Sequence, residues 1–381
     1  MKQHEKIPFA RPFVPENQEL LPYLGRIRES HMLSNGGPLH EELEQELAGF
    51  LGVKYVSLFT NGSIALMVAL KALDLEGEVI TTPFTWIATA QAVHWNNLTP
   101  VFADIHICEM NIDPGGVEGL ITSRTSAMLP VHVFGNPCDV DTLQSLADKY
   151  QLKIVYDAAH AFGVRLHDQS VSNFGNLSVL SFHATKVFNC FEGGAIISHD
   201  KSMKEKIDAL RNHGFTKDGK LAGYGLNGKM NEMQAACGLI HLKHVDRQIK
   251  QRKAATDTYR QLLANTEGID LFPEKPGIRQ NFSYFPVLVD KAVFGGDRDE
   301  LMGYLENRGI TTRAYFSQLV TDFDQFGGYT SASLPNARMV ADRILCLPLF
   351  HGITNEQIAR VVIAIAGFRR KAPGMKKAAA K

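Results

Sequence analysis

Short apolar segments alternate with amphipathic helical patterns through the first 250 residues of this 381-residue chain. Helical periodicity predicts helices at residues 39–51, 64–73 and 140–150. Apolar runs predict strands at residues 54–60, 79–81, 101–103, 127–131, 154–156, 179–182 and 195–198. Such alternation is typical of βαβ units, in which helices cover both faces of a mainly parallel sheet. We therefore expect a large α/β domain over residues 1–250, with an N-terminal arm.

The pattern changes after residue 250. A charged helix is expected at 251–263, followed by a strand at 282–289, a helix at 299–307 and a strand at 310–316. Thr354 and Gln357 have the spacing of a capping box before the apolar run 358–368. The tail 369–381 is basic and alanine-rich, and we expect it to be frayed. Residues 251–381 are thus predicted to form a smaller α+β domain.

Composition excludes several classes of protein. Forty basic residues balance forty acidic ones, which argues against a broad surface for nucleic acid or membrane. The five cysteines are scattered and form no CxxC pair, so we expect a reduced chain without a thiolate metal site. The first residues lack the apolar core of a signal peptide, and no stretch approaches the ~20 apolar residues of a membrane span. These features predict a cytoplasmic protein with no metal site.

Lys186 is the most informative candidate for chemistry. It follows the run Ser181-Phe182-His183-Ala184-Thr185 and precedes Glu192-Gly193-Gly194. Burial disfavours an ammonium ion, lowers its pKa and frees an amine that can attack a carbonyl. Most lysines are instead solvated surface charges, so the neighbouring motifs have to decide between these interpretations.

Two further motifs suggest a site that binds a phosphate group with one part and presents a carboxylate with another. Asn61-Gly62-Ser63 lies between a predicted strand and a predicted helix, whose first N–H groups can bind an anion. An ordinary capped helix is the alternative. Asp157 ends the strand 153–156, where ligands bind in parallel sheets, although it could also be a capping residue. No GxGxxG or GxxxxGK[ST] string occurs, so a Rossmann-type dehydrogenase is disfavoured.

Three other side chains remain open from sequence alone. Trp86 is either a core aromatic residue or a surface for stacking on a ligand ring. His160 and His183 are either structural histidines or site residues.

Taken together, these blocks resemble the DegT/DnrJ/EryC1/StrS family of pyridoxal-phosphate-dependent sugar aminotransferases. The similarity runs from about residue 32 to residue 368. Its matching blocks are residues 61–66, 83–89, 100–104, 157–163, 181–186, 192–194, 225–227, 230–236 and 347–349. The resemblance implies a fold-type I transferase: a mainly parallel central sheet with helices on both faces, plus a smaller C-terminal α+β domain.

The resemblance also implies roles for individual residues. Lys186 would bind pyridoxal 5'-phosphate covalently and serve as the catalytic base. Asp157 would pair with the pyridine nitrogen, and Trp86 would stack on the ring. The remaining cofactor contacts would be Gly62, Ser63 and Ser181 at the phosphate, His160 near the phenolic oxygen, and Asn227 reaching the neighbouring subunit's phosphate. Active sites would then be shared across a homodimer. His183, Arg313 and Tyr315 would line the sugar side.

The same resemblance suggests a reaction. Relatives that dehydrate sugars carry histidine at the position of Lys186, so the lysine favours transamination. The string Phe182-His183-Ala184-Thr185 is similar to members that act at C4 of dTDP- or UDP-linked 4-keto-6-deoxyhexoses, with L-glutamate as the amino donor. The product, such as dTDP-4-amino-4,6-dideoxyglucose, would serve polysaccharide (O-antigen) biosynthesis. The alternatives are a C3-acting sugar aminotransferase and a non-catalytic regulatory protein that binds pyridoxal phosphate.

Overall fold

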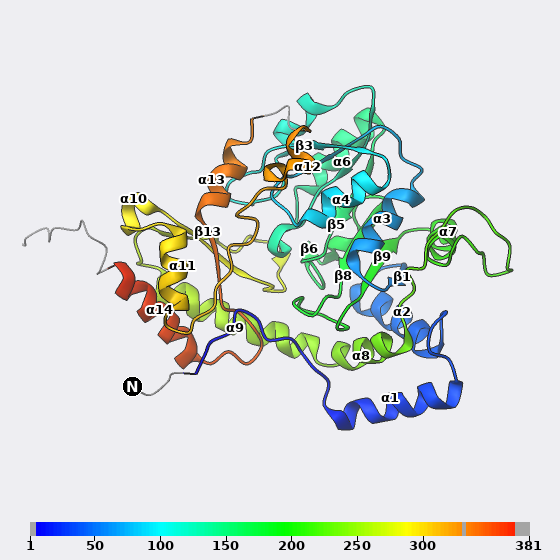
Figure 1. Cartoon of the computed structure of the whole chain (residues 1–381), viewed down its shortest axis with the longest axis horizontal. Coiled ribbons are helices and arrows are strands. Elements are labelled where there is room, and N and C mark those ends of the chain that lie inside the picture. Colours follow the sequence, from blue (N-terminus) through cyan, green and yellow to red (C-terminus); the bar gives the residue numbers. More distant parts are fainter. Residues whose placement is uncertain (1–4, 330–332, 370–381) are drawn as a thin grey trace, which may run out of the picture.

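The computed structural model describes residues 5–329 and 333–369, and a seven-stranded sheet forms the centre of its larger part (Figure 1). The strands lie in the order β1 (Tyr55–Phe59), β9 (Gly194–Ser198), β8 (Leu177–Ser181), β5 (Lys153–Asp157), β4 (Thr125–Leu129), β2 (Glu78–Thr81) and β3 (Thr99–Phe102). The pairs from β8 to β3 are parallel, whereas β9 runs antiparallel to both of its neighbours. The predicted mainly parallel sheet is confirmed.

Helices cover both faces of this sheet because successive strand residues point to opposite sides. Val79 of β2 packs with α3 (Gly62–Ala72), α4 (Ile87–Trp95) and α7 (Lys201–Arg211). The next residue, Ile80, packs with α6 (Val140–Tyr150) on the other face. That face also carries α2 (Pro38–Leu51) and α8 (Glu232–Leu242), with α1 (Asn17–Ser30) outside α8. The expected two-sided coverage is therefore present.

The C-terminal part contains an antiparallel sheet with helices packed against it. Its strands are β10 (Ile269–Leu271), β12 (Phe285–Val289) and β13 (Ile344–Leu347). They share an apolar core with α9 (Val245–Leu263), α11 (Arg298–Glu306) and α14 (Asn355–Arg369). The smaller α+β unit is thus present. The division at residue 250 stays a prediction, and α9 runs through that position without a break (Figure 1).

Several predicted elements differ from the structure. The strand expected at 310–316 is wrong: that segment makes only isolated bridges, Ile310 to Ile7 and Arg313 to Cys346. The N-terminal arm occupies the position at Ile310 that a neighbouring strand would take. The strand expected at 282–289 begins only at Phe285. The capping box is confirmed, since Thr354 Oγ1 accepts from the Gln357 N–H at 3.2 Å. The predicted fraying concerns residues that lie, apart from residue 369, outside the described part.

The remaining elements are short and lie mainly in connections. A second three-stranded sheet has the order β11-β6-β7. These elements are β6 (Arg165–Leu166), β7 (Gln169–Ser170), β11 (Ile278–Arg279), α5 (Pro114–Val117), α10 (Lys291–Phe294), α12 (Asp324–Gly327), α13 (Pro335–Arg343), and 3-10 turns at Glu118–Leu120, Val133–Gly135, Val171–Asn173 and Val320–Asp322. None of the helices in the described ranges combines the length and apolar character that a membrane crossing requires.

Two glycines bring the start of α3 against the ends of β8 and β9. A Cβ on Gly194 would lie 2.8 Å from the backbone of Asn61 and Gly62, and a Cβ on Gly62 would lie 2.9 Å from Ser181 Cβ. Real Cβ atoms do not approach other atoms this closely, so both positions require glycine. The close approach places the first turn of α3 beside Ser181.

Gly194→Ala should therefore lower the free energy of unfolding by about 1–3 kcal/mol, because the added methyl overpacks a backbone contact. Urea unfolding followed by circular dichroism measures the change. Gly49→Ala on α2 is the matched control: a Cβ there meets no atom within 4 Å, so this helical substitution should stabilise the protein by about 0.5–1 kcal/mol. Equal effects of the two variants would contradict the proposed close approach.

Candidate active site

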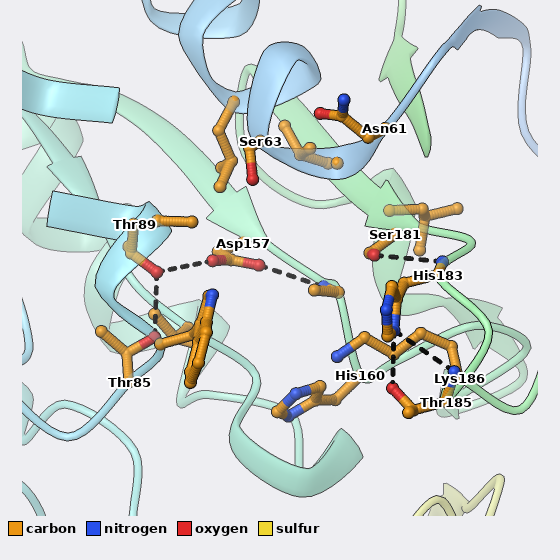
Figure 2. Close-up of a pocket in the computed structure, with 18 of the residues that line it drawn as sticks. Asn61, Ser63, Thr85, Thr89, Asp157, His160, Ser181, His183, Thr185 and Lys186 are labelled. Atoms are coloured by element: carbon orange, nitrogen blue, oxygen red, sulfur yellow. Dashed lines mark hydrogen bonds between the residues drawn. The ribbon is translucent and has the colours of Figure 1, made fainter. Parts of the chain in front are cut away.

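A cavity of about 550 Å³ opens at the carboxyl ends of the central strands. Asp157 ends β5 and Ser181 ends β8, and both side chains face the cavity with the first turn of α3 (Figure 2). This edge is where ligands bind in open α/β sheets. Nine of the residues predicted for the site line it: Gly62, Ser63, Trp86, Asp157, His160, Ser181, His183, Lys186 and Tyr315.

One end of the cavity is suited to a phosphate group. Asn61 caps α3, and its Oδ1 accepts from the Ile64 N–H at 2.8 Å. The N–H groups of Gly62 and Ser63 lie in the first turn, where a helix supplies no backbone acceptor. The hydroxyls of Ser63 and Ser181 border the same space (Figure 2). The capping interpretation is thus confirmed, and the capped end also faces the cavity; its use as an anion site stays a prediction.

Asp157 also lines the cavity and is 5% exposed. Its Oδ2 accepts from the Thr89 hydroxyl at 2.8 Å, and its Oδ1 accepts from the Ala159 N–H at 3.1 Å. Burial raises the pKa of this carboxyl, while the hydrogen bond from Thr89 opposes that shift. Asp157 therefore lines the cavity with both carboxylate oxygens anchored.

Lys186 approaches the cavity from the loop after β8, and Figure 2 shows it beside His160 and below Asp157. Desolvation of the amine lowers the pKa of Lys186 to about 8, although the nearby Asp157 carboxylate pulls in the opposite direction. A free amine is therefore available near neutral pH, as nucleophilic chemistry at a carbonyl requires. Lys186 is not one of the solvated surface lysines.

His160 is held as a neutral ring. Burial lowers its pKa well below the usual value, and the charge of Lys186 adds to this effect. Its Nδ1 accepts from the Phe134 N–H at 3.1 Å, so the single ring proton lies on Nε2. Phe134 reaches this position with φ of 55°, in the left-handed region that non-glycine residues rarely adopt. The backbone thus fixes the tautomer of His160 as a donor through Nε2.

Trp86 stands at the start of α4 and is 62% exposed, although it lines the cavity. A core aromatic residue would be buried, so the stacking interpretation fits this position. An indole ring that borders a cavity supplies a flat apolar surface for a ligand ring.

The three residues predicted for the sugar side are placed differently from one another. His183 lies at the cavity mouth, where its Nδ1 is 2.8 Å from Thr185 Oγ1 and its Nε2 is 3.6 Å from Glu192 Oε1. Tyr315 lines the cavity from the C-terminal part. Arg313 is exposed, and its backbone pairs with Cys346. It does not line this cavity in the described residues.

Asn227 is also absent from the lining of this cavity in the described residues. It lies on the segment between α7 and α8, which projects from the body of the protein (Figure 1). Its side chain is exposed, and its backbone pairs with Asn212. The expected contact of Asn227 with the phosphate in a neighbouring subunit stays a prediction.

Several lining residues were not identified from the sequence. Thr85 and Thr89 fall within the matching block 83–89, and their spacing of four on a helix start was the available signal. Tyr284 and Phe316 come from the C-terminal part and pack around His160, with ring centroids 4.9 and 6.0 Å from its own. No local pattern links these distant segments to the cavity.

Comparison with known proteins assigns the chain to a class. A model described as the DegT/DnrJ/EryC1/StrS aminotransferase family matches residues 15–366. The chain belongs to the DegT/DnrJ/EryC1/StrS aminotransferase family, which confirms the resemblance found in the sequence blocks.

Individual relatives match along nearly the whole chain. A dTDP-4-amino-4,6-dideoxy-D-glucose transaminase from Shigella dysenteriae is 46% identical over 357 residues, covering 93% of this chain and 97% of the relative. A protein of the same name from Escherichia coli is 43% identical over 367 residues, covering 95% and 98%. The crystal structure of DesI with its TDP-sugar product superposes with a TM-score of 0.92 at 37% identity, covering 96% of this chain and 94% of that one.

The pKa of Lys186 provides a direct test of the site's electrostatics. Reductive ¹³C-methylation of the apo-protein, followed by NMR titration, should show one lysine signal that titrates near pH 8. The signal should be missing in Lys186→Arg. In Asp157→Asn the midpoint should fall further, because the attraction that favours the ammonium form is removed. A Lys186 midpoint at the ordinary 10.5 would contradict burial of the amine.

Proposed function

We propose that the protein is a pyridoxal-phosphate-dependent nucleotide-sugar aminotransferase that moves an amino group from L-glutamate to C4 of a dTDP- or UDP-linked 4-keto-6-deoxyhexose. One observation carries the proposal: Lys186, with its pKa lowered to about 8, faces Asp157 in a cavity whose other end can bind a phosphate. The two relatives named as dTDP-4-amino-4,6-dideoxy-D-glucose transaminases support the sugar and the carbon atom.

The described residues fit pyridoxal phosphate. The close approach at Gly62 and Gly194 places the first turn of α3 beside Ser181, so the free N–H groups of that turn and the hydroxyls of Ser63 and Ser181 border one space as donors for a phosphate. Asp157 can accept from a ring nitrogen at the far side. When bound, the cofactor would supply an aldehyde for the lysine amine and a ring that accepts electrons.

Each residue then has a defined task. Lys186 would hold the cofactor through Nζ and would serve as the amine that accepts and returns a proton at the substrate carbon. Asp157 would keep the ring nitrogen protonated by its negative charge. His160 would donate through Nε2 toward the phenolic oxygen, and Trp86 would cover one ring face and exclude water there.

His183 supports action at C4. Its string Phe182-His183-Ala184-Thr185 matches the C4 type, and the ring lies at the mouth of the cavity. Thr185 orients it through a 2.8 Å hydrogen bond. A C3-acting enzyme and a non-catalytic regulatory protein are the alternatives that the following experiment separates.

Product analysis tests the reaction. The holo-protein, mixed with L-glutamate and a dTDP-4-keto-6-deoxy sugar, should form the 4-amino product, which NMR identifies by the carbon that carries nitrogen. The corresponding 3-keto sugar should react poorly. Lys186→Ala should lose at least about a hundredfold in rate, because the proton-transfer group is gone.

The control is the site of covalent attachment. Borohydride reduction of the holo-protein, followed by mass spectrometry, should place the cofactor on Lys186. Preferred reaction of the 3-keto sugar would favour the C3 alternative. Cofactor on Lys186 without amino transfer from any donor would favour the regulatory alternative, and an adduct elsewhere would overturn the proposal.

A homodimer with shared sites is part of the proposal, and two observations support it. Asn227 is exposed and does not line the cavity of its own chain in the described residues. Its projecting segment carries exposed apolar side chains, Phe215, Leu221 and Tyr224, at 45%, 66% and 96%. Exposed apolar groups that gather on one segment are typical of interfaces. A twofold partner would cover them and bring Asn227 to the second cavity. A cytoplasmic location stays a prediction.

Subunit mixing tests the shared site. Asn227→Asp should inactivate the enzyme, because a carboxylate repels the cofactor's phosphate. Denaturing and refolding it with an equal amount of Lys186→Ala should restore roughly a quarter of wild-type activity, since half of the dimers then hold one intact site. The separately refolded variants serve as controls. If Asn227 served its own chain, no mixed dimer would contain an intact site and activity would stay absent.

A further inference from the structure

A chain of hydroxyl groups extends from Asp157 along the wall of the cavity that the start of α4 forms. Thr89 Oγ1 lies 2.8 Å from Asp157 Oδ2, and Thr85 Oγ1 lies 2.9 Å from Thr89 Oγ1 (Figure 2). Thr85 is 4% exposed and Thr89 is fully buried. Neither residue is explained by the roles assigned above.

The number of protons available fixes which group donates in each of these hydrogen bonds. An ionised carboxylate only accepts hydrogen bonds, and a threonine hydroxyl has a single proton to donate. Thr89 must use that proton toward Asp157, so its oxygen can only accept from Thr85. The donors are therefore ordered from Thr85 to Thr89 to Asp157, and each bond polarises the next.

This hydrogen-bond chain also fixes the orientation of the Asp157 carboxylate. Asp157 Oδ2 is held by Thr89, and Oδ1 is held by the Ala159 N–H. A carboxylate offers about four lone-pair positions, so two anchors leave a restricted direction for a further donor. The rotation of the Asp157 side chain is thereby limited before any ligand binds.

The same turn carries the stacking residue. Trp86 lies between Thr85 and the first turn of α4, and its carbonyl accepts from the Thr89 N–H at 3.1 Å. One short segment thus carries both Trp86, the proposed stacking surface, and Thr89, the residue that anchors Asp157.

We propose that Thr89, supported by Thr85, is a positioning residue that keeps Asp157 ionised and aimed at the ring nitrogen of the cofactor. This inference rests on the proposed function, because it assumes pyridoxal phosphate in the cavity. Charge-assisted hydrogen bonds are among the strongest in proteins. The loss of the Thr89 hydroxyl should therefore be felt at the ring nitrogen and nowhere else on the cofactor.

The test measures binding rather than turnover. Apo-protein is titrated with pyridoxal phosphate and with its 1-deaza analogue, in which C–H replaces the ring nitrogen. Thr89→Val should weaken pyridoxal phosphate roughly tenfold, as expected for one hydrogen bond to a charged group. The analogue should bind to wild type and variant within about twofold, because it offers Asp157 no donor. Thr89→Ser should restore most of the affinity, and Thr85→Val should show a smaller loss.

Thr256→Val on α9 is the matched control. Thr256 is 3% exposed, and its hydroxyl has no hydrogen-bond partner in the described residues, so the same substitution should leave both affinities unchanged. A pH titration of the visible band adds an independent readout. In Thr89→Val the pKa of the nitrogen that joins Lys186 to the cofactor should rise, because a less protonated ring no longer repels its proton.

The outcomes are distinct. Equal weakening of both ligands by Thr89→Val would mean a merely structural role, and unchanged affinity for both would mean no role; either result overturns the inference. Failure of wild-type protein to bind pyridoxal phosphate would instead overturn the proposed function. Urea unfolding of each variant shows whether the protein is folded. If Thr89→Val does not fold, Thr85→Val keeps the test decisive, because it should weaken pyridoxal phosphate but not the analogue.

Discussion

The site depends on one constraint: burial shifts the pKa of an acid and the pKa of a base in opposite directions. Burial of Asp157 raises the pKa of its carboxyl, and partial desolvation of the half-buried Lys186 lowers the pKa of its amine. Each group partly restores the charge of the other across the cavity. The result is a reactive amine and an anchored acid in one chamber at neutral pH.

The fold produces this arrangement from the ends of two strands and one helix. β5 ends in Asp157, β8 ends in Ser181, and α3 begins beside them because glycines at 62 and 194 allow the backbones to meet. Asp157, Ser181 and the first turn of α3 thus line the cavity from rigid elements, whereas His183 and Lys186 lie on the loop after β8. Rigid placement suits a site that has to hold a flat ring between an acid and an indole.

Much of this was predictable from sequence because the signals are local. Lys186, Asp157 and the Asn61-Gly62-Ser63 turn each follow an apolar strand, and strand ends in a parallel sheet meet at one edge. The strand expected at 310–316 was wrong because Ile310 pairs with the distant Ile7. Tyr284 and Phe316 were missed for the same reason: packing between remote segments, not local periodicity, brings them to His160. The role of Asn227 was inferred from the family blocks alone, and because the residue does not line the described cavity, that role stays a prediction.

The left-handed backbone at Phe134 carries a further consequence for how the energy of the site is distributed. A non-glycine residue in that region costs on the order of 1–3 kcal/mol, and the cost is met once, as the chain folds. In return, the imidazole of His160 arrives with its orientation and proton already set. No rotamer search at that ring is then needed in each catalytic cycle. Conformational strain that is introduced when the protein folds thus preorganises the site for turnover.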